Sequence, residues 1–342
     1  MTMQLPAPVQ YVPYQCVGDQ PNIIVDGAPL ASTVLNLSHW PVNRTPAAVR
    51  RDSSTATVFA YLDMAELHQN VPIVSNNHFD EDGLCSMFAL CQPSVALDHR
   101  ALLIGCGMAG DFGVYEDADA LRLCFILEAF GDPGVSPLPA ETFAGCEQQR
   151  VESLYRTMLE RLPLLLGDVN AYEALWGAQF EHVEESAELI ARGAITIAEY
   201  ADVDLAVVSI PDDQPLRTVR RYFEPEQAAV HPFAIHNATT CNRILRVTGA
   251  RYELQYRYES WLQLVSHRPA LRVALDGLAA RLNAIEGASG TWRCESATEI
   301  VPRLYLEGVG ASSIELGRFV DEVCSYLATA PVAWDPYHWE GG

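Results

Sequence analysis

The part of the sequence with the greatest chemical capacity runs from His78 to Gly83 and reads His-Phe-Asp-Glu-Asp-Gly. Asp80 and Asp82 lie two residues apart, so a turn can direct both carboxylates toward one cation, and His78 can add an imidazole nitrogen. Mixed carboxylate and imidazole ligands suit manganese, iron or magnesium better than a thiolate-bound zinc. We therefore expect a site for Mn²⁺ or Mg²⁺ here; the alternative is an acidic helix cap on a solvated loop.

The residues on either side predict a strand before this loop and a helix after it. Residues 71–75 (VPIVS) form a short apolar run rich in β-branched residues, which is typical of a buried strand. Residues 84–90 (LCSMFAL) form an apolar helix that starts just after Gly83, where the backbone can bend sharply. A strand, a polar loop and a helix in this order place the loop at the carboxyl end of a parallel sheet, where open α/β folds bind ligands.

Residues 78–90, after their apolar strand, resemble the first motif of the DHH phosphoesterase superfamily, a DxDG sequence followed by a helix. The superfamily includes RecJ-type exonucleases, small-oligonucleotide phosphatases and inorganic pyrophosphatases. The resemblance implies that Asp80 and Asp82 are ligands of a two-metal centre. Asn76 stands where the histidine-containing members of the superfamily have their histidine.

Two further stretches are similar to later motifs of the same superfamily. Asp98-His99-Arg100 resembles a truncated DHH signature in which Arg100 replaces the last histidine, and Asp111, in a glycine-flanked turn, resembles the aspartate of the last motif. The resemblance therefore implies metal ligation by Asp80, Asp82, Asp98 and Asp111. We expect catalytic roles for His78, as a ligand or general acid, for His99, as a ligand candidate from the resemblance, and for Arg100, as a cationic group at the phosphoryl oxygens.

Such a centre would hydrolyse a phosphate ester. Two divalent ions about 3.5 to 4 Å apart activate a water molecule and clamp a phosphoryl oxygen, and protein groups must hold the other phosphoryl oxygens. Candidates for that second role, chosen for residue type and for a position in loops or near strand starts, are Arg44, Arg100, His231, His236, Asn237 and Arg243. We expect an enzyme, a metal-dependent hydrolase acting on a small phosphorylated or nucleotide-like substrate.

Two other functions remain open. The chain could be a non-catalytic ligand-binding or assembly protein that keeps only part of the metal site, or a biosynthetic metalloenzyme with non-phosphate chemistry. The sequence contains no P-loop, GxGxxG or GxSxG motif. Nucleotide-driven phosphoryl transfer, dinucleotide redox chemistry and serine-hydrolase chemistry therefore have no support.

Composition restricts the partners and the compartment. The net charge of −22 disfavours long duplex nucleic acid, because binding to phosphates needs clustered basic residues, whereas a local arginine cluster at positions 217–221 could serve a small anion. Nine cysteines without paired CxxC spacing indicate reduced thiols. The sequence contains no run of eighteen apolar residues, so we expect no membrane span. The N-terminus lacks the pattern of an export signal, so we expect a cytoplasmic protein. The sequence leaves open whether it forms a homo-oligomer.

Hydrophobic periodicity and length predict an α/β protein with two domains. Residues 1–30, rich in Pro and Gln, suggest an extended arm. Residues 31–200 suggest a DHH-like domain with a parallel sheet and a helical middle, and residues 201–342 a smaller α+β domain for substrate binding. Expected strands are 32–37, 71–75 and 204–210, with a hairpin of 243–247 and 251–258. Expected helices are 55–67, 84–90, 118–130, 146–166, 173–192, 269–286 and 312–328.

Overall fold

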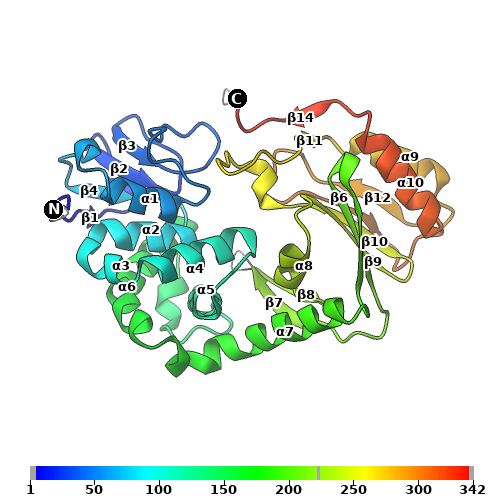
Figure 1. Cartoon of the computed structure of the whole chain (residues 1–342), viewed down its shortest axis with the longest axis horizontal. Helices are drawn as coiled ribbons and strands as arrows, with labels where there is room; N and C mark the ends of the chain where they lie inside the picture. Colours follow the sequence, from blue (N-terminus) through cyan, green and yellow to red (C-terminus); the bar gives the residue numbers. More distant parts are fainter. Residues whose placement is uncertain (1–4, 222–223, 339–342) are drawn as a thin grey trace. The chain divides into compact units, whose positions relative to one another are not determined.

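The chain forms a mixed α/β structure with a parallel sheet at its N-terminal end, a helical middle and a C-terminal α+β region, as the sequence predicts (Figure 1). It is a computed structural model that describes residues 5–221 and 224–338. The chain divides into two compact units. The first unit comprises the residues up to Glu181 together with Thr218–Gln227 and Leu264–Ser266, and the second unit comprises the remainder. The division falls inside a helix at Glu181, before the boundary expected near Ala201.

The first unit contains a four-stranded sheet in which every strand pair is parallel. Its order is β1 (Gln10–Tyr11), β4 (Ile73–Ser75), β2 (Asn22–Val25) and β3 (Thr33–Leu37). The expected extended arm is therefore wrong for residues 5–30, because β1 and β2 lie within this sheet, while residues 1–4 lie outside the described part of the chain. The four residues of β2 are all buried, and so short an apolar run is hard to detect among prolines and glutamines. The parallel order brings the carboxyl ends of β2, β3 and β4 to one edge.

Helices pack against this sheet and against one another. Helix α1 (Ser54–Leu62) contacts β3, and α2 (Glu81–Cys91) contacts β1, β2 and β4. Helix α2 also packs against α4 (Arg100–Phe112), and its first ten residues are buried. The other helices that begin in this unit are α3 (Pro93–Asp98), α5 (Ala118–Gly131), α6 (Glu147–Gly167) and α7 (Glu173–Ala191). Short 3-10 helices are η1 (Tyr14–Cys16), η2 (Ala65–Leu67), η3 (Ala140–Phe143) and η4 (Val169–Tyr172).

Helix α4 corrects one expectation. Residues 107–113 were expected to form a glycine-flanked turn, but the helix continues to Phe112 and ends at Gly113, whose φ of 65° closes it in the left-handed region. Gly107 and Gly110 instead make room for side chains of α2. A Cβ atom at Gly107 would lie 2.4 Å from Asp82 Oδ1, and one at Gly110 would lie 2.6 Å from Glu81 Oε2. These glycines therefore serve a close helix contact and not a turn.

The second unit contains a six-stranded sheet with the order β12-β13-β10-β9-β6-β5. Only β6 and β9 are parallel neighbours, and the predicted hairpin of β9 and β10 is present, with Gly249 at φ 56° in its turn. The strands are β5 (Thr196–Tyr200), β6 (Leu205–Ile210), β9 (Arg243–Thr248), β10 (Arg251–Tyr256), β12 (Thr291–Cys294) and β13 (Arg303–Glu307). Two smaller sheets pair β7 (Arg217–Arg221) with β8 (Glu224–Ala228) and β11 (Arg272–Val273) with β14 (Val332–Trp334).

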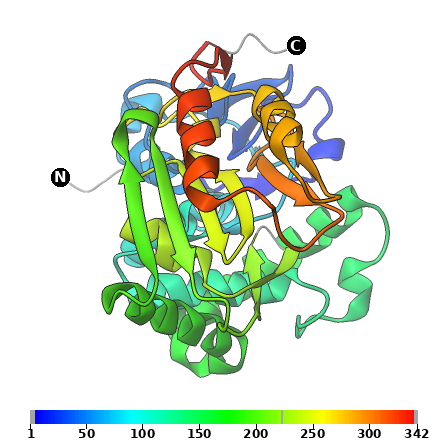
Figure 2. The same cartoon turned by 90° about the vertical axis from the view of Figure 1, so that its right-hand side faces the viewer.

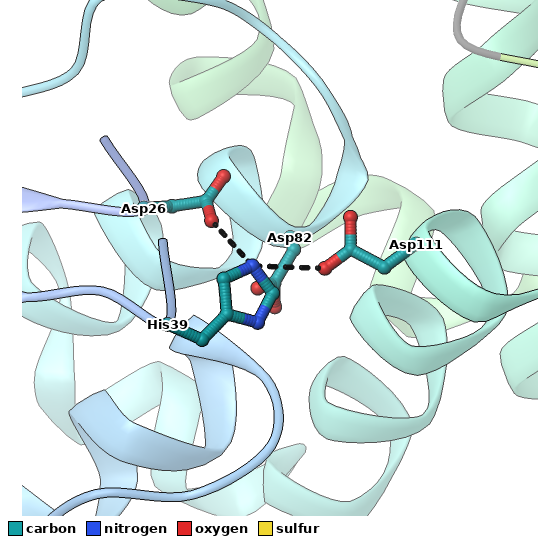
Figure 3. Close-up of side chains that lie close together, drawn as sticks. All are labelled: Asp26, His39, Asp82 and Asp111. Carbon is teal, nitrogen blue, oxygen red and sulfur yellow. Dashed lines mark ion pairs between the residues drawn. The ribbon is translucent and has the colours of Figure 1, made fainter. Parts of the chain in front are cut away.

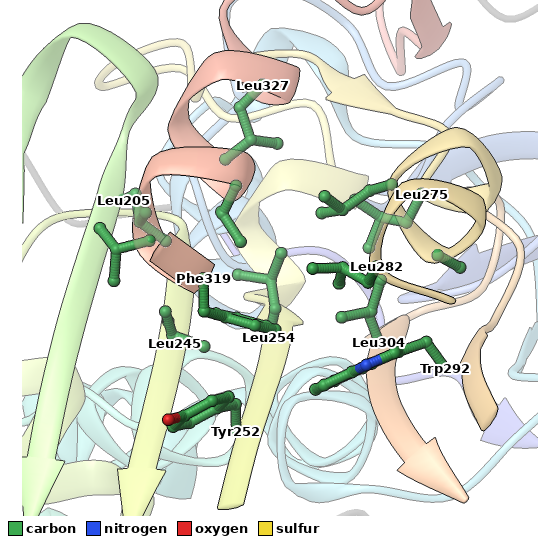
Figure 4. Close-up of a cluster of buried hydrophobic side chains, with 14 of the residues drawn as sticks. Leu205, Leu245, Tyr252, Leu254, Leu275, Leu282, Trp292, Leu304, Phe319 and Leu327 are labelled. Atoms are coloured by element: carbon green, nitrogen blue, oxygen red, sulfur yellow. The ribbon is translucent and has the colours of Figure 1, made fainter. Parts of the chain in front are cut away.

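Side chains on the two faces of this sheet enter different cores, as the two-residue period of a strand requires. Leu205 and Val207 of β6 join the core formed with α9 (Asp276–Ile285) and α10 (Leu316–Leu327), drawn in Figure 4. Figure 2 shows these two helices lying on one face of the sheet. Ala206 and Val208 join the other core, which includes Ile235 of α8 (Pro232–Ala238). The remaining 3-10 helices are η5 (Ala201–Val203) and η6 (Tyr258–Trp261).

All nine cysteines are free, as their scattered spacing predicts. Among the helices of residues 5–221 and 224–338, none is long and apolar enough to cross a membrane.

A partly exposed carboxylate, that of Glu286, holds the end of α9 in place. Glu286 accepts hydrogen bonds from Ser312 Oγ (2.6 Å), from the backbone amide of Ser313 (2.8 Å) and from Trp292 Nε1 (3.1 Å). Burial raises the pKa of Glu286, but the hydrogen bonds from Ser312 and Ser313 outweigh it and lower the pKa to about 2 from an ordinary 4.5. Because the folded pKa is the lower one, this stabilisation is complete above pH 4.5 and is lost as the pH falls toward 2.

We expect Glu286→Gln to lower the free energy of unfolding at pH 7 by about 1 kcal/mol, the low end for hydrogen bonds to a charged group, since the site is partly exposed. Urea unfolding from pH 7 to pH 2 should show this difference from the wild type shrinking below pH 4.5. Glu307→Gln is the control, because Glu307 forms an exposed pair with Arg293 and its loss should change stability little. A Glu286 effect that is independent of pH would contradict the charge-based explanation.

Candidate metal centre

Four buried side chains converge at the carboxyl edge of the parallel sheet (Figure 3). Asp26 follows β2, His39 follows β3 by two residues, Asp82 lies in the first turn of α2 after β4, and Asp111 lies in the last turn of α4. One ligand atom from each lies within 4.8 Å of the others. Oxygen and imidazole ligands at 2.0 to 2.6 Å from one cation are separated by distances of this order, so these four residues can surround a single ion.

A second group of possible ligands shares Asp26 with the first and adds His78 and Asp80. His78 Nε2 lies 2.8 Å from Asp80 Oδ2 and 3.2 Å from Asp26 Oδ2. The other oxygen of Asp26, Oδ1, lies 3.4 Å from His39 Nε2 in the first group. Each oxygen of the Asp26 carboxylate therefore faces one group, which is the arrangement of a carboxylate that bridges two cations.

The backbone at Asp26 is unusual. Its φ of 45° lies in the left-handed region, which short polar residues such as Asp tolerate best after glycine. Ser54 Oγ, at the start of α1, donates a 2.8 Å hydrogen bond to Asp26 Oδ1. This turn points the carboxylate, which is 1% exposed, back over the end of the strand.

The side chain of Asp82 is held by α1 as well as by its own helix. Its two oxygens accept hydrogen bonds from the backbone amides of Ser54 (2.6 Å) and Thr55 (2.9 Å), and Thr55 Oγ1 donates to the Asp82 carbonyl. These amides belong to the first turn of α1, where backbone N–H groups have no partner inside the helix. Each carboxylate oxygen has a further lone pair. Asp82 can therefore cap α1 and bind a cation at the same time.

His39 has the orientation of a metal-binding histidine. Its Nδ1 lies 2.5 Å from the backbone carbonyl of Asp52, which can only accept a hydrogen bond, so Nδ1 carries the proton. Nε2 points toward Asp26 Oδ1 and Asp111 Oδ2, at 3.4 and 3.5 Å. It donates to these carboxylates when the ring is protonated and offers its lone pair to a cation when the ring is neutral. In metal sites the nitrogen that does not bind the ion is commonly fixed in this way by a carbonyl.

The pKa values of the first group reflect crowding of buried carboxylates. Burial and then the charge of Asp26 raise the pKa of Asp82 to about 6. Burial and then Asp82 raise the pKa of Asp111 well above its usual range. Burial also acts to raise the pKa of Asp26, but hydrogen bonds from His39 and His78 outweigh it and lower that pKa. The carboxylates therefore resist ionising together, and a divalent cation would supply the missing positive charge. The donor set thus fits a divalent metal.

A neighbouring carboxyl lies beneath the cluster. Burial and then Asp80 raise the pKa of Glu81 to about 8, and its side chain occupies the space left by Gly110 of α4. Asp80 caps α2 through one oxygen, since Oδ1 accepts a 2.7 Å hydrogen bond from the Gly83 amide while Oδ2 faces His78. His78 in turn stacks on Trp40, with ring centroids 4.9 Å apart.

The structure brings together four of the residues expected at the site, namely His78, Asp80, Asp82 and Asp111. It does not bring in Asp98, His99 or Arg100, which lie at the corner between α3 and α4. From Arg100 to Asp111 helix α4 rises roughly 16 Å, so direct metal bonds cannot reach across. Asp98 is exposed, and Arg100 pairs with Asp63. The expectation that Asp98 and His99 share this centre is therefore corrected.

The expected substrate-binding residues have other surroundings. Arg44 is exposed on the loop after β3. The other four belong to the second unit, where His231 caps α8, His236 is 7% exposed, and Asn237 donates to the Phe233 carbonyl. Arg243 donates from its two terminal nitrogens to the carbonyls of Val203 and Leu271. These contacts of His231 and Asn237 lie within α8, and those of Arg243 connect two loops, so these residues have structural roles apart from the metal cluster of the first unit.

Sequence reasoning missed Asp26 and His39. Both follow short apolar runs, NIIV and TVLNL, in the same way that His78 and Asp80 follow β4. A search for every polar residue directly after a short apolar run would have included them. Without the strand order, however, nothing in the sequence indicates that these ends meet.

Gly107→Ala should disturb the centre, since its new Cβ atom would lie 2.4 Å from Asp82 Oδ1 and 3.1 Å from Thr55 Oγ1. We expect the free energy of unfolding to fall by about 1–3 kcal/mol, as in overpacked cores. Gly177→Ala in α7 is the control, because its Cβ would meet Glu173 Cγ at an ordinary 3.4 Å and the better helix propensity should raise stability by up to about 1 kcal/mol. Chemical denaturation measures both, and equal effects of the two substitutions would refute the close contact.

Comparison with known proteins gives the family but not a function. No curated protein and no solved structure is similar enough to be matched with this chain. Residues 7–338 match a family described as a family of unknown function, DUF6687. Since this match covers nearly the whole chain, the chain belongs to the DUF6687 family.

Proposed function

We propose that this protein is a metal-dependent hydrolase, a phosphoesterase that uses two Mn²⁺ or Mg²⁺ ions to act on a small phosphorylated substrate. The observation that carries the proposal is the sharing of Asp26 between two groups of possible ligands, one with His39, Asp82 and Asp111 and the other with His78 and Asp80. Bridged pairs of divalent ions are typical of enzymes that displace an oxygen at phosphorus. The resemblance of residues 78–90 to the DHH phosphoesterase superfamily supports the same reaction.

Bound at these positions, the two cations would supply an activated water and charge stabilisation for the phosphoryl group. The protein would supply their geometry. Asp26 would bridge them, and Asp82 and Asp111 would complete the inner position. The α2 N-terminus, which Asp82 itself belongs to, adds a partial positive charge that favours an anion nearby.

The two groups differ in access to solvent, which suggests the side from which a substrate arrives. The side chains of His39, Asp26 and Asp111 are at most 4% exposed, whereas His78 and Asp80 are 27% and 16% exposed. A substrate would therefore reach the His78 side first. His78 would either complete the outer metal position or donate a proton to the leaving group, with its ring held by the stacked indole of Trp40.

The alternatives remain a ligand-binding protein with no catalysis and a metalloenzyme with non-phosphate chemistry. The first would bind metal or ligand without turnover, and the second would need the metal centre but would not cleave phosphate esters. The net charge of −22 favours a small anionic substrate over long nucleic acid in each case.

The test combines metal binding with turnover. We expect the wild type to bind two equivalents of Mn²⁺ by isothermal titration calorimetry and to hydrolyse bis(p-nitrophenyl) phosphate only when Mn²⁺ is present. Asp82→Asn should lower turnover by at least about 100-fold, because even changes in the outer shell of metal sites cost 10- to 100-fold. Asp98→Asn is the matched control, since Asp98 is exposed and lies away from the cluster.

Three outcomes separate the functions. Metal binding with hydrolysis that Asp82→Asn abolishes supports the phosphoesterase. Metal binding without hydrolysis points to one of the two alternatives, a non-catalytic binding protein or a metalloenzyme with non-phosphate chemistry. Absence of Mn²⁺ and Mg²⁺ binding by the wild type would reject the proposal.

A further inference from the structure

Two short segments from the C-terminal half of the chain are built into the first unit. Thr218–Gln227 and Leu264–Ser266 belong to that unit, although the residues on both sides of each segment belong to the second unit. The chain thus leaves the second unit twice, contributes a few residues to the unit that holds the candidate metal centre, and returns. The contacts of these residues show which groups of the first unit they hold.

The first segment reaches the end of helix α4. Arg221, the last residue of β7, is 9% exposed and donates a 3.1 Å hydrogen bond from Nη2 to the backbone carbonyl of Asp111. This carbonyl lies in the last turn of α4, where carbonyl groups have no partner inside the helix and a positive charge is favourable. Asp111 is at the same time a candidate ligand, so the guanidinium holds the backbone from which that carboxylate projects.

The strand that carries Arg221 is itself anchored in the first unit. Val219 is fully buried, and the carbonyl of Thr218 accepts a 2.8 Å hydrogen bond from Gln179 Nε2. Arg220 Nε pairs with Asp132 Oδ2 at 2.7 Å, just after α5. Arg221 also partly offsets the buried carboxyl of Glu128 on α5, whose pKa is raised by burial and then by Glu81.

The second segment reaches His39 through Asp52. The backbone amides of Val265 and Ser266 donate hydrogen bonds of 2.6 and 3.0 Å to Asp52 Oδ1. The carbonyl of the same Asp52 accepts the Nδ1 hydrogen of His39 and so fixes the ring with Nε2 toward the cluster. Two residues of the C-terminal half, Val265 and Ser266, therefore hold the residue that orients a second ligand.

We propose that these two segments position two ligands of the metal centre, Asp111 through Arg221 and His39 through Asp52. Arg221 and Asp52 are positioning residues and not catalytic ones, since each acts through its neighbour. The proposal rests on the proposed metal centre for its functional meaning. It goes further in making metal affinity depend on residues contributed by the C-terminal half of the chain.

Hydrogen exchange of the metal-free, full-length protein tests the positioning directly. In Arg221→Met, amides of residues 103–113 should exchange about tenfold faster than in the wild type, because a hydrogen bond from a charged donor is lost. Arg221→Lys, which keeps the charge, should restore part of the protection. Arg220→Met is the matched control on the same strand, since its partner Asp132 is not a ligand candidate; it loosens the strand without removing the bond to Asp111, so exchange in residues 103–113 should rise much less than in Arg221→Met.

The second segment has its own pair of variants. Asp52→Ala should speed exchange in residues 36–43 about tenfold, whereas Asp52→Asn keeps an oxygen that can accept from Val265 and Ser266 and should exchange nearly as the wild type does. Titration of the same proteins with Mn²⁺ should show affinity 10- to 100-fold weaker in Arg221→Met and Asp52→Ala, the usual effect of losing an outer-shell partner.

The exchange measurement stands independently of metal binding. Faster exchange confined to the named residues supports the positioning roles, and unchanged or uniformly faster exchange across the chain overturns them. If the wild type bound no Mn²⁺, the proposed function would fall, while the exchange result would still decide whether the two segments hold α4 and the His39 loop.

Discussion

The structure of the first unit depends on the crowding of carboxylates in a buried place. Asp26, Asp82 and Asp111 are each at most 3% exposed and approach one another closely enough to share a cation. Burying like charges together is strongly unfavourable unless hydrogen bonds, opposite charges or a metal ion compensate. The surroundings supply such partners in the amides of α1 and the imidazoles of His39 and His78. So many converging partners are difficult to explain for an ordinary core but are typical of a functional site.

The strand order explains how residues far apart in the sequence reach this place. Since β4, β2 and β3 are parallel neighbours, the residues that follow them emerge at one edge. Asp26, His39 and the loop from His78 to Asp82 are therefore brought together by the sheet alone. Asp111 comes from the other direction, at the end of a helix that can approach α2 only because Gly107 and Gly110 have no side chains. The sheet order and the two glycines are thus both needed to bring the four side chains together.

The strand order and the glycines of α4 also explain how far the structure could be predicted from the sequence. The loop from His78 to Gly83 was recognisable because its ligands, strand and helix are contiguous, and the β9–β10 hairpin because its pairing is local. Asp26 and His39 were missed because their importance depends on the order of strands, which a single sequence does not reveal. Asp98-His99 looked like a ligand pair by residue type, yet the intervening helix carries it to the far end of α4. The glycines of α4 suggested a turn, since their role in helix contact is visible only when α2 is in place.

Further buried carboxyl groups surround the residues of the two ligand groups. Glu81 and Glu128 are buried carboxyls without direct roles in the ligand groups, and both have raised pKa values, with burial as the largest cause. With a pKa of about 8, Glu81 would stay largely protonated near neutral pH and add little to the negative charge of the cluster, and burial shifts the pKa of Glu128 in the same direction. Arg221 lowers the raised pKa of Glu128 in part and donates a hydrogen bond to the Asp111 carbonyl. Arg221 lies in a strand far along the chain, yet its segment, Thr218–Gln227, belongs to the same compact unit as the cluster, so residues distant in sequence contribute to the charge balance of that unit.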